Sequence, residues 1–198
     1  MLFEPTRAEG LARMATFVPR AGKSYQERRN FDLDEAQISA VSQLSPWLRH
    51  HLISEQEVLT SALEQHNFQT AIPYVQQVFW RGYFNGWLEQ HPTVWMSYKA
   101  QLAKAQQNQN HDYAEAIAGQ TGILCFDHWC NTLKDEGYLH NHARLWFASI
   151  WIFTLRLPWE LGAALFLEHL HDGDPASNTL SWRWVAGLHT KGKNYVAT

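Results

Sequence analysis

Signals that start and stop α-helices recur along this chain, and no run of residues alternates for long enough to predict a β-strand. Thr6 and Ser54 each stand three residues before a glutamate, the spacing of a capping box, in which side chains satisfy free amides at a helix start. Pro73 is expected to open a long helix that runs to about Gln90, and Pro92 to close it. The pattern predicts an all-α fold.

The second half of the chain continues the same pattern. Residues 121–136 read as a helix that Gly137 stops, and residues 139–155 as a central buried helix. Pro158 and Pro175 each stand where the first residue of a helix is expected. Because the loops between these segments are short or polar, we expect one helical domain over residues 1–198.

Composition and charge exclude several classes of protein. The most apolar run, residues 145–155, is about half of the roughly 20 residues that a membrane helix needs, so no membrane span is expected. Two cysteines are too few for a four-thiolate iron–sulfur or zinc site. The N-terminus has no signal-peptide pattern, and with so few thiols this predicts the cytoplasm. The net charge of −3 argues against a protein whose main role is to bind phosphate groups.

Ten tryptophans and 14% aromatic residues are the one anomaly of composition. Tryptophan is a large, rigid ring whose N–H needs a partner when it is buried. Chains this rich in it often line a site for a flat ligand. The alternative, which composition alone favours, is a helical core built from large residues.

Residues 169–178 are the densest polar stretch, with two histidines and two aspartates within six positions. The DGD at residues 172–174 resembles the start of a calcium loop, but the glycine and glutamate that such a loop needs do not fall in place. A zinc site would have to recruit His140 and His142 from upstream. A polar turn between two helices explains the stretch as well, and no metal is expected.

The same stretch resembles a known family. HDGDPASNTLSWRW (residues 171–184) is similar to the DGD…N…WQW signature of the DNA photolyase/cryptochrome family. The spacings between the three C-terminal blocks also match, and the similarity extends over nearly the whole chain. The other matching blocks are GYLHNHAR (137–144), GQTG (119–122), FWR (79–81), QLSPWL (43–48) and YQERRN (25–30).

The resemblance implies FAD as the cofactor and assigns residues to it. In the family, the positions of Asp172 and Asp174 contact the ribityl side and the flavin ring, and that of Asn178 faces flavin N5. Arg144 matches an arginine that lies against the ring and pairs with the first aspartate, where its charge offsets that of a reduced flavin. Three more positions match ligand or phosphate contacts: Tyr25, Ser45 and Asn141.

Electron transfer and DNA repair use further positions of the family. Trp182 and Trp159 match the first two members of its tryptophan chain, whereas the third aligns with Gln106. Trp80 and Trp184 match the two rings that flank a flipped-out pyrimidine dimer.

Four departures concern the ligands and the extent of the chain. Gln77 stands where the family has the glutamate that contacts the dimer, and Gln43 replaces an arginine near the phosphates. The chain also begins about where the flavin-binding half begins, without the α/β antenna domain, and it ends before its relatives do.

These matches and departures leave more than one function open. The main prediction is an FAD-binding, photolyase/cryptochrome-like protein with light-driven flavin redox chemistry. One alternative is a working photolyase that binds damaged DNA, an interaction that the negative net charge predicts to be weak. A second is a blue-light sensor or flavin-binding partner subunit that does no repair. A third is a degenerate helical domain that has lost its flavin.

Overall fold

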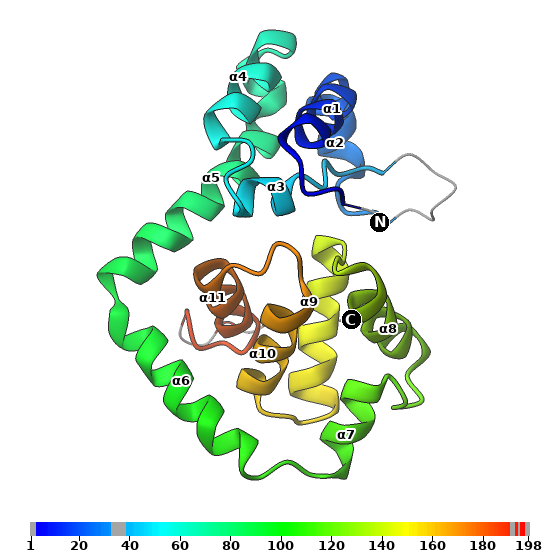
Figure 1. Ribbon diagram of the computed structural model, residues 1–198, viewed down its shortest axis with the longest axis vertical. Coiled ribbons are helices and arrows are strands. Elements are labelled where there is room, and N and C mark those ends of the chain that lie inside the picture. The colour runs from blue at the N-terminus through cyan, green and yellow to red at the C-terminus, as the bar shows by residue number, and fades with distance from the viewer. Residues whose placement is uncertain (1–2, 33–38, 191–192, 194, 197–198) are drawn as a thin grey trace. The chain divides into compact units, whose positions relative to one another are not determined.

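The structure is a computed structural model that describes residues 3–32, 39–190, 193 and 195–196. All regular elements in those ranges are helical, which confirms the all-α prediction (Figure 1). A 3-10 turn at Val18–Arg20 and a π-helical turn at Ile150–Thr154 accompany the α-helices. The α-helices are α1 (Arg7–Phe17), α2 (Lys23–Arg28), α3 (Ser45–Arg49), α4 (Glu55–Gln65), α5 (Phe68–Gln90), α6 (Pro92–Gln106), α7 (His111–Ala118), α8 (Leu124–Glu136), α9 (Asn141–Ser149), α10 (Trp159–His169) and α11 (Pro175–Val185).

The chain divides into two compact units, Met1–Tyr83 and Phe84–Thr198, and the division falls inside α5. Each unit is described by itself. The extent of a single domain over residues 1–198 stays a prediction. No helix in the described part of the chain is long and apolar enough to cross a membrane.

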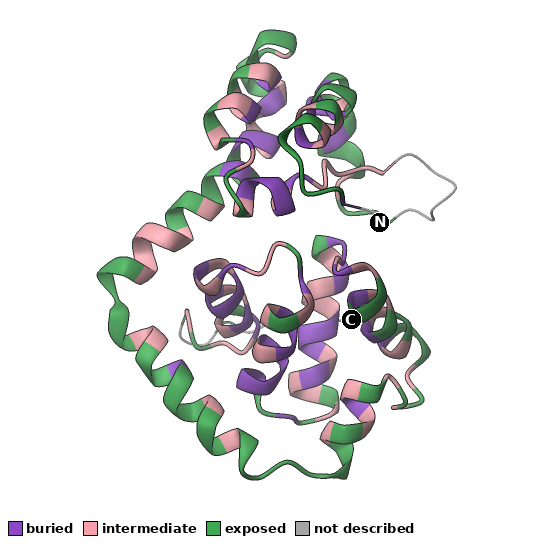
Figure 2. Cartoon of the chain, viewed as in Figure 1, coloured by how far each residue is buried: buried purple, intermediate pink, exposed green. Residues whose placement is uncertain are grey.

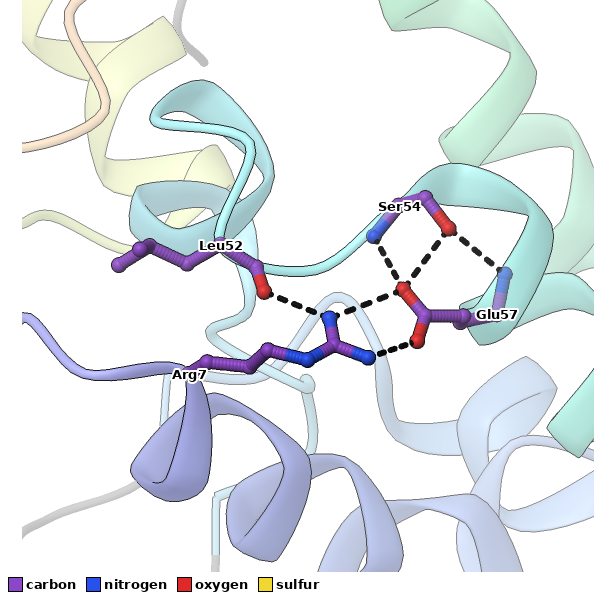
Figure 3. Close-up of polar contacts among 4 residues, drawn as sticks. All are labelled: Arg7, Leu52, Ser54 and Glu57. Atoms are coloured by element: carbon purple, nitrogen blue, oxygen red, sulfur yellow. Dashed lines mark hydrogen bonds and ion pairs between the residues drawn. The ribbon is translucent and has the colours of Figure 1, made fainter.

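At the surface of the first unit, hydrogen bonds connect the start of α1 to the start of α4 (Figure 3). The Ser54 N–H and hydroxyl each donate to Glu57 Oε2 at 2.9 Å, and the Glu57 N–H donates to Ser54 Oγ at 3.2 Å, which confirms the predicted capping box. Arg7 donates to the Glu57 carboxylate and, at 2.8 Å, to the Leu52 carbonyl. The hydrogen bond from Arg7, with those from Ser54, lowers the pKa of Glu57 to about 2.

Of the other predicted capping box, at Thr6 and Glu9, only one of the two hydrogen bonds forms. The Thr6 hydroxyl accepts from the Glu9 N–H at 3.3 Å, but the Thr6 N–H donates to the Glu4 carbonyl at 2.8 Å. Beneath this turn, α1 lies on the buried ring of Trp47, since a Cβ added at Gly10 would stand 2.8 Å from Trp47 Cδ1. The absent side chain of Gly10 is therefore what lets the helix approach the ring.

The start of α5 differs from its prediction. The helix begins at Phe68, where the side chain of Asn67 accepts from the Thr70 N–H at 3.0 Å, and Pro73 lies inside it. Pro73 is the sixth residue of the helix, beyond the first amides that lack an intrahelical partner, so it removes one hydrogen bond that the Gln69 carbonyl would otherwise accept. The end at Gln90 is confirmed, but Pro92 opens α6 rather than only closing α5.

The second unit contains the main core, to which α8, α9, the π-helical turn, α10 and α11 contribute. Figure 2 shows buried residues gathered along α10 and α11, whereas most of α6 is exposed. The buried Trp182 lies across α10 at Gly162, where an added Cβ would stand 2.3 Å from Trp182 Cη2. Any larger residue at position 162 would overpack the core.

Two predicted helix starts in the second unit were wrong. α8 begins at Leu124 rather than Thr121, because the Asp127 carboxylate accepts the N–H groups of Thr121 and Gly122 at 2.9 Å and holds them in a turn. Pro158 stands one residue before α10, at its N-cap position, and makes no side-chain capping hydrogen bond. The central buried helix predicted over residues 139–155 is confirmed, as α9 and the π-helical turn that directly continues it.

Candidate functional site

Asp174, Asn178 and Trp182 share one face of α11, because side chains four residues apart lie above one another on a helix. All three are buried. Asp174 begins the helix, since its Oδ1 accepts from the Ser177 N–H at 2.8 Å. The Asn85 amide lies 3.5 Å from the same oxygen. The sequence therefore fixes this polar row through one capping residue and the helical repeat.

The orientation of the Asn178 amide follows from its partner. Its Nδ2 donates to the Ala163 carbonyl at 2.8 Å. A carbonyl only accepts hydrogen bonds, so the nitrogen must be the atom that faces α10. No donor in the described part of the chain reaches Oδ1. Asn178 is therefore held by its nitrogen and keeps its oxygen available as an acceptor.

Arg144 and Asp172 form a two-pronged ion pair. Arg144 Nη1 and Nη2 donate to the two oxygens of Asp172 at 3.0 and 2.9 Å, and Nε donates to the Leu139 carbonyl at 2.9 Å. The Arg144 side chain is 23% exposed and that of Asp172 only 6%. Burial acts to lower the pKa of Arg144, but the charge and hydrogen bonds of Asp172 outweigh it, so the pKa is raised.

The turn that carries Asp172 lies against the end of α8. Gly137 ends that helix at φ 66°, which confirms the predicted stop, and its carbonyl accepts from the His171 N–H at 2.9 Å. A Cβ added at Gly137 would stand 2.4 Å from His171 Nε2. Both the backbone conformation and the space therefore require glycine. Gly137 thus brings the segment of Arg144 and that of Asp172 together.

Trp182 is almost wholly buried among aromatic side chains. Its ring meets the edge of Phe166 at a centroid distance of 5.1 Å and that of Trp151 at 6.3 Å. No acceptor among the described residues bonds its buried Nε1. The indole N–H is a strong donor, so a partner for it is missing from this arrangement.

Trp159 lies in a different set of rings. It is buried, and its centroid is 5.4 Å from that of Tyr98, which is in turn 5.2 Å from that of Trp95. No ring contact joins Trp159 to Trp182 in the described part of the chain. Burial, followed by the charge of Glu160, raises the pKa of Tyr98 to about 12. The order of electron donors implied by the resemblance stays a prediction.

The remaining predicted residues of the second unit lie at its surface. Asn141 is exposed at the first residue of α9. Trp184 is 40% exposed, and its ring lies 5.4 Å from that of Tyr195. These two side chains are accessible to a ligand or to a macromolecule.

Four predicted residues belong to the first unit. Gln77 and Trp80 are exposed on α5, and the ring of Trp80 lies 5.3 Å from that of Tyr83. Ser45 is half-buried at the start of the five-residue α3. Tyr25 is a core residue packed on Tyr74, and burial raises the pKa of its phenol. The two α5 side chains are therefore accessible, whereas the Tyr25 ring serves the core.

Sequence reasoning missed Arg13. Its Nη1 donates to Gln43 Oε1 at 2.7 Å, and its guanidinium lies 5.2 Å from the ring centroids of Phe3 and Trp47. Arg13 on α1 thus places a positive charge beside Gln43, the position at which the resemblance implies an arginine. No motif marks Arg13, because the contact joins residues 30 positions apart.

Comparison with known families gives a match over the whole second unit and the last residues of the first. Residues 74–198 match the family described as the FAD binding domain of DNA photolyase. A deoxyribodipyrimidine photo-lyase of Streptomyces griseus is 34% identical over 158 residues, which are 79% of this chain and 34% of the relative. One from Neurospora crassa is 27% identical over 197 residues, 94% of this chain and 31% of the relative. The chain thus spans about a third of these curated relatives.

Solved structures share the fold over nearly the whole chain. A bacterial class III photolyase from Agrobacterium tumefaciens superposes with a TM-score of 0.79 at 27% identity, covering 96% of this chain and 40% of that one. A cryptochrome from Synechocystis sp. has the same TM-score at 24% identity, covering 100% of this chain and 42% of that one. At this identity, the second likeness shows the fold alone.

The ion pair gives a prediction about stability. Asp172→Ala is expected to lower the free energy of unfolding by about 3–5 kcal/mol, because it leaves the mostly buried Arg144 guanidinium without its counter-charge. Replacing both partners by leucine should recover much of this loss, since no lone charge then stays buried. Urea unfolding followed by circular dichroism measures both. Asp135→Ala, at an exposed position, is the control. An Asp172→Ala variant as stable as the wild type would contradict the assignment.

Proposed function

The chain belongs to the FAD-binding-domain family of DNA photolyase, and on that premise we propose that it holds FAD beside the buried polar face of α11 and carries out light-driven flavin redox chemistry. The observation that carries the proposal is the pairing of Arg144 with Asp172, together with an Asn178 amide whose oxygen is available. FAD supplies light absorption and one-electron redox chemistry. The chain's own residues bind and orient it and set its charge.

The residues present fit a flavin. Asn178 offers an acceptor, so it suits a ring nitrogen that carries a proton, such as reduced flavin N5. Arg144 keeps its positive charge, because Asp172 raises its pKa, and it can offset negative charge on a reduced ring. The buried Trp182 N–H is a donor that lacks an acceptor among the described residues. A ring system with hydrogen-bond donors, acceptors and variable charge offers a partner to each of these three side chains.

Asp172 acts through Arg144. With both its oxygens bonded to the guanidinium, the carboxylate fixes the plane and position of that group. Asp174 fixes the first turn of α11 and so the height of Asn178 along the helix. We therefore assign Arg144 and Asn178 to contact with the flavin ring. Asp172 and Asp174 hold that pair in place, besides the ligand contacts that the resemblance implies for them.

The phosphate and ribose side is assigned to the other predicted residues. The resemblance supports Tyr25, Ser45 and Asn141 as ligand contacts. The ring of Tyr25 is buried, and the guanidinium of Arg29 lies 6.0 Å from its centroid. Arg13 supplies a positive charge at Gln43, where the resemblance had implied a missing one.

Light-dependent repair of pyrimidine dimers is a second candidate function. The exposed rings of Trp80 and Trp184, 48% and 40% accessible, support it because both can stack on a flipped-out base. Gln77 weighs against it, since an amide cannot supply the negative charge of the missing glutamate. The sixteen Lys and Arg residues against nineteen acids favour weak binding to damaged DNA.

A third candidate, a light sensor that acts on a protein partner in the cytoplasm, needs the flavin but no repair. The buried arrangement of Arg144, Asp172 and Asn178 argues against a helical domain that has lost its flavin. A charged pair is costly to bury, so its retention calls for a role.

Retention of FAD tests the proposal. The double variant Asp172→Ala/Asp174→Ala is expected to lose most of its bound FAD, because Arg144 loses its partner and α11 loses its cap. FAD is released by denaturation and quantified per chain, and circular dichroism checks the helix content. Asp112→Ala/Asp135→Ala, which removes two exposed acids, should keep its FAD. Full FAD content in the first variant would show that the site is elsewhere.

The repair candidate has its own test at position 77. We expect the wild type to repair cyclobutane dimers slowly or not at all. Gln77→Glu should raise the rate by roughly tenfold or more if Trp80 and Trp184 hold the dimer, since a hydrogen bond to a charged group contributes about 1.5–3 kcal/mol. The assay follows dimers in an irradiated oligonucleotide under blue light, with the flavin reduced beforehand.

The neighbouring Gln76→Glu, exposed on the same helix, is the matched control for charge. Wild-type repair as fast as that of a full-length photolyase measured alongside would establish the repair function and overturn our expectation.

A further inference from the structure

We propose that Trp151 and Tyr113 form a relay that carries the oxidising equivalent from Trp182 to the surface of the second unit. The inference rests on the proposed function, in which Trp182 lies next to the flavin. It concerns two residues that no motif of the sequence marks, one in the π-helical turn and one on α7. The route consists of Trp182, Trp151 and Tyr113 in that order.

The first step is a close contact between two indoles. The centroids of Trp182 and Trp151 lie 6.3 Å apart with the rings at 85°. A Cβ added at Gly162 would stand 2.3 Å from Trp182 Cη2 and 3.0 Å from Trp151 Cε2. The two rings therefore meet over the bare backbone of Gly162. Short gaps between aromatic rings allow an electron to pass, and here no side chain separates them.

Trp151 is held rigidly in the middle of the route. It is fully buried, and its Nε1 donates to the Pro158 carbonyl at 2.9 Å. Its ring is stacked near that of Phe147, with centroids 5.9 Å apart and 23° between the planes. The π-helical turn at Ile150–Thr154 determines this placement. A positive charge is costly in such apolar surroundings, so an oxidised Trp151 would readily take an electron from a further donor.

Tyr113 is that donor. Its ring lies 6.0 Å from that of Trp151, at 87°, and its side chain is half-buried. Burial, followed by the negative charge of Glu168, raises the pKa of its phenol. The phenol is therefore protonated before oxidation. Glu168 is exposed and, with solvent, can take the proton that a tyrosine releases when it is oxidised.

Each step conserves electrons and protons. Trp182 gives one electron to the light-excited flavin, Trp151 gives one to Trp182, and Tyr113 gives one to Trp151. Tyr113 loses its phenolic proton to Glu168 or to water and becomes a neutral radical. A thiol in solution then returns one electron and one proton to Tyr113, and two oxidised thiols couple to a disulfide.

The competing rings around Trp159 are less suited to this role. Trp159 has no ring contact with Trp182 in the described part of the chain. The hydroxyl of its neighbour Tyr98 is buried without a hydrogen-bond partner there, and Glu160, whose charge acts on it, is buried too. A proton released by Tyr98 therefore has no exposed acceptor, whereas Tyr113 is half-buried and its neighbour Glu168 is exposed. The ammonium of Lys99 lies 6.0 Å from the centroid of Trp95, where it opposes a second positive charge on that ring.

Time-resolved electron paramagnetic resonance after a blue flash tests the relay, since it identifies the radical rather than an activity. The wild type, loaded with FAD, should form a tyrosyl radical. Tyr113→Phe and Trp151→Phe should lose that signal and leave a short-lived tryptophan radical. Trp159→Phe should keep the tyrosyl signal. Trp129→Phe, which replaces a half-buried tryptophan outside the route, is the control.

Tyr113→Phe removes only a hydroxyl at a half-buried position, so it tests the relay even where a change at the fully buried Trp151 disturbs folding. A tyrosyl signal that persists in Tyr113→Phe, or that disappears in Trp159→Phe alone, overturns the relay and leaves the flavin site standing. A protein that takes up no FAD overturns the proposed function, and the relay with it.

Discussion

The buried ion pair between Arg144 and Asp172 is the interaction on which the functional site depends. Two charges removed from water are stable only together, so neither segment can move without the other. Gly137 makes the contact between the segments feasible, because only glycine fits its left-handed conformation against His171. The pair therefore joins the start of α9 to the turn before α11 and fixes the face that presents Asn178.

The second constraint on the structure is a glycine, whose missing side chain allows aromatic rings to pack directly on the backbone. Gly162 lets Trp182 lie directly across α10, and the same gap admits the edge of Trp151. Dense aromatic packing explains the anomaly of composition, because tryptophans of the second unit build its core. The two interpretations of the tryptophan content are thus compatible, because a ring that packs the core beside a flavin can also exchange electrons with it.

Much of the fold could be predicted from local sequence, because caps act over three or four residues. Ser54 and Gly137 were predicted correctly for that reason. Pro73 and Thr121 gave wrong helix starts, because Asn67, six residues before Pro73, and Asp127, six residues after Thr121, determine those starts instead. For the site, the resemblance identified Arg144 and Asp172 as a pair. Arg13 and Trp151 could not be predicted, since their contacts join distant residues and a π-helical turn leaves no local signal.

The central claim is that this chain binds a flavin through the face of α11. The visible absorption spectrum of the purified protein, before and after incubation with FAD, tests it most directly. We predict the bands of a bound oxidised flavin, with FAD released in about equal numbers to chains on denaturation. A folded, colourless protein that takes up no FAD from solution would contradict the account.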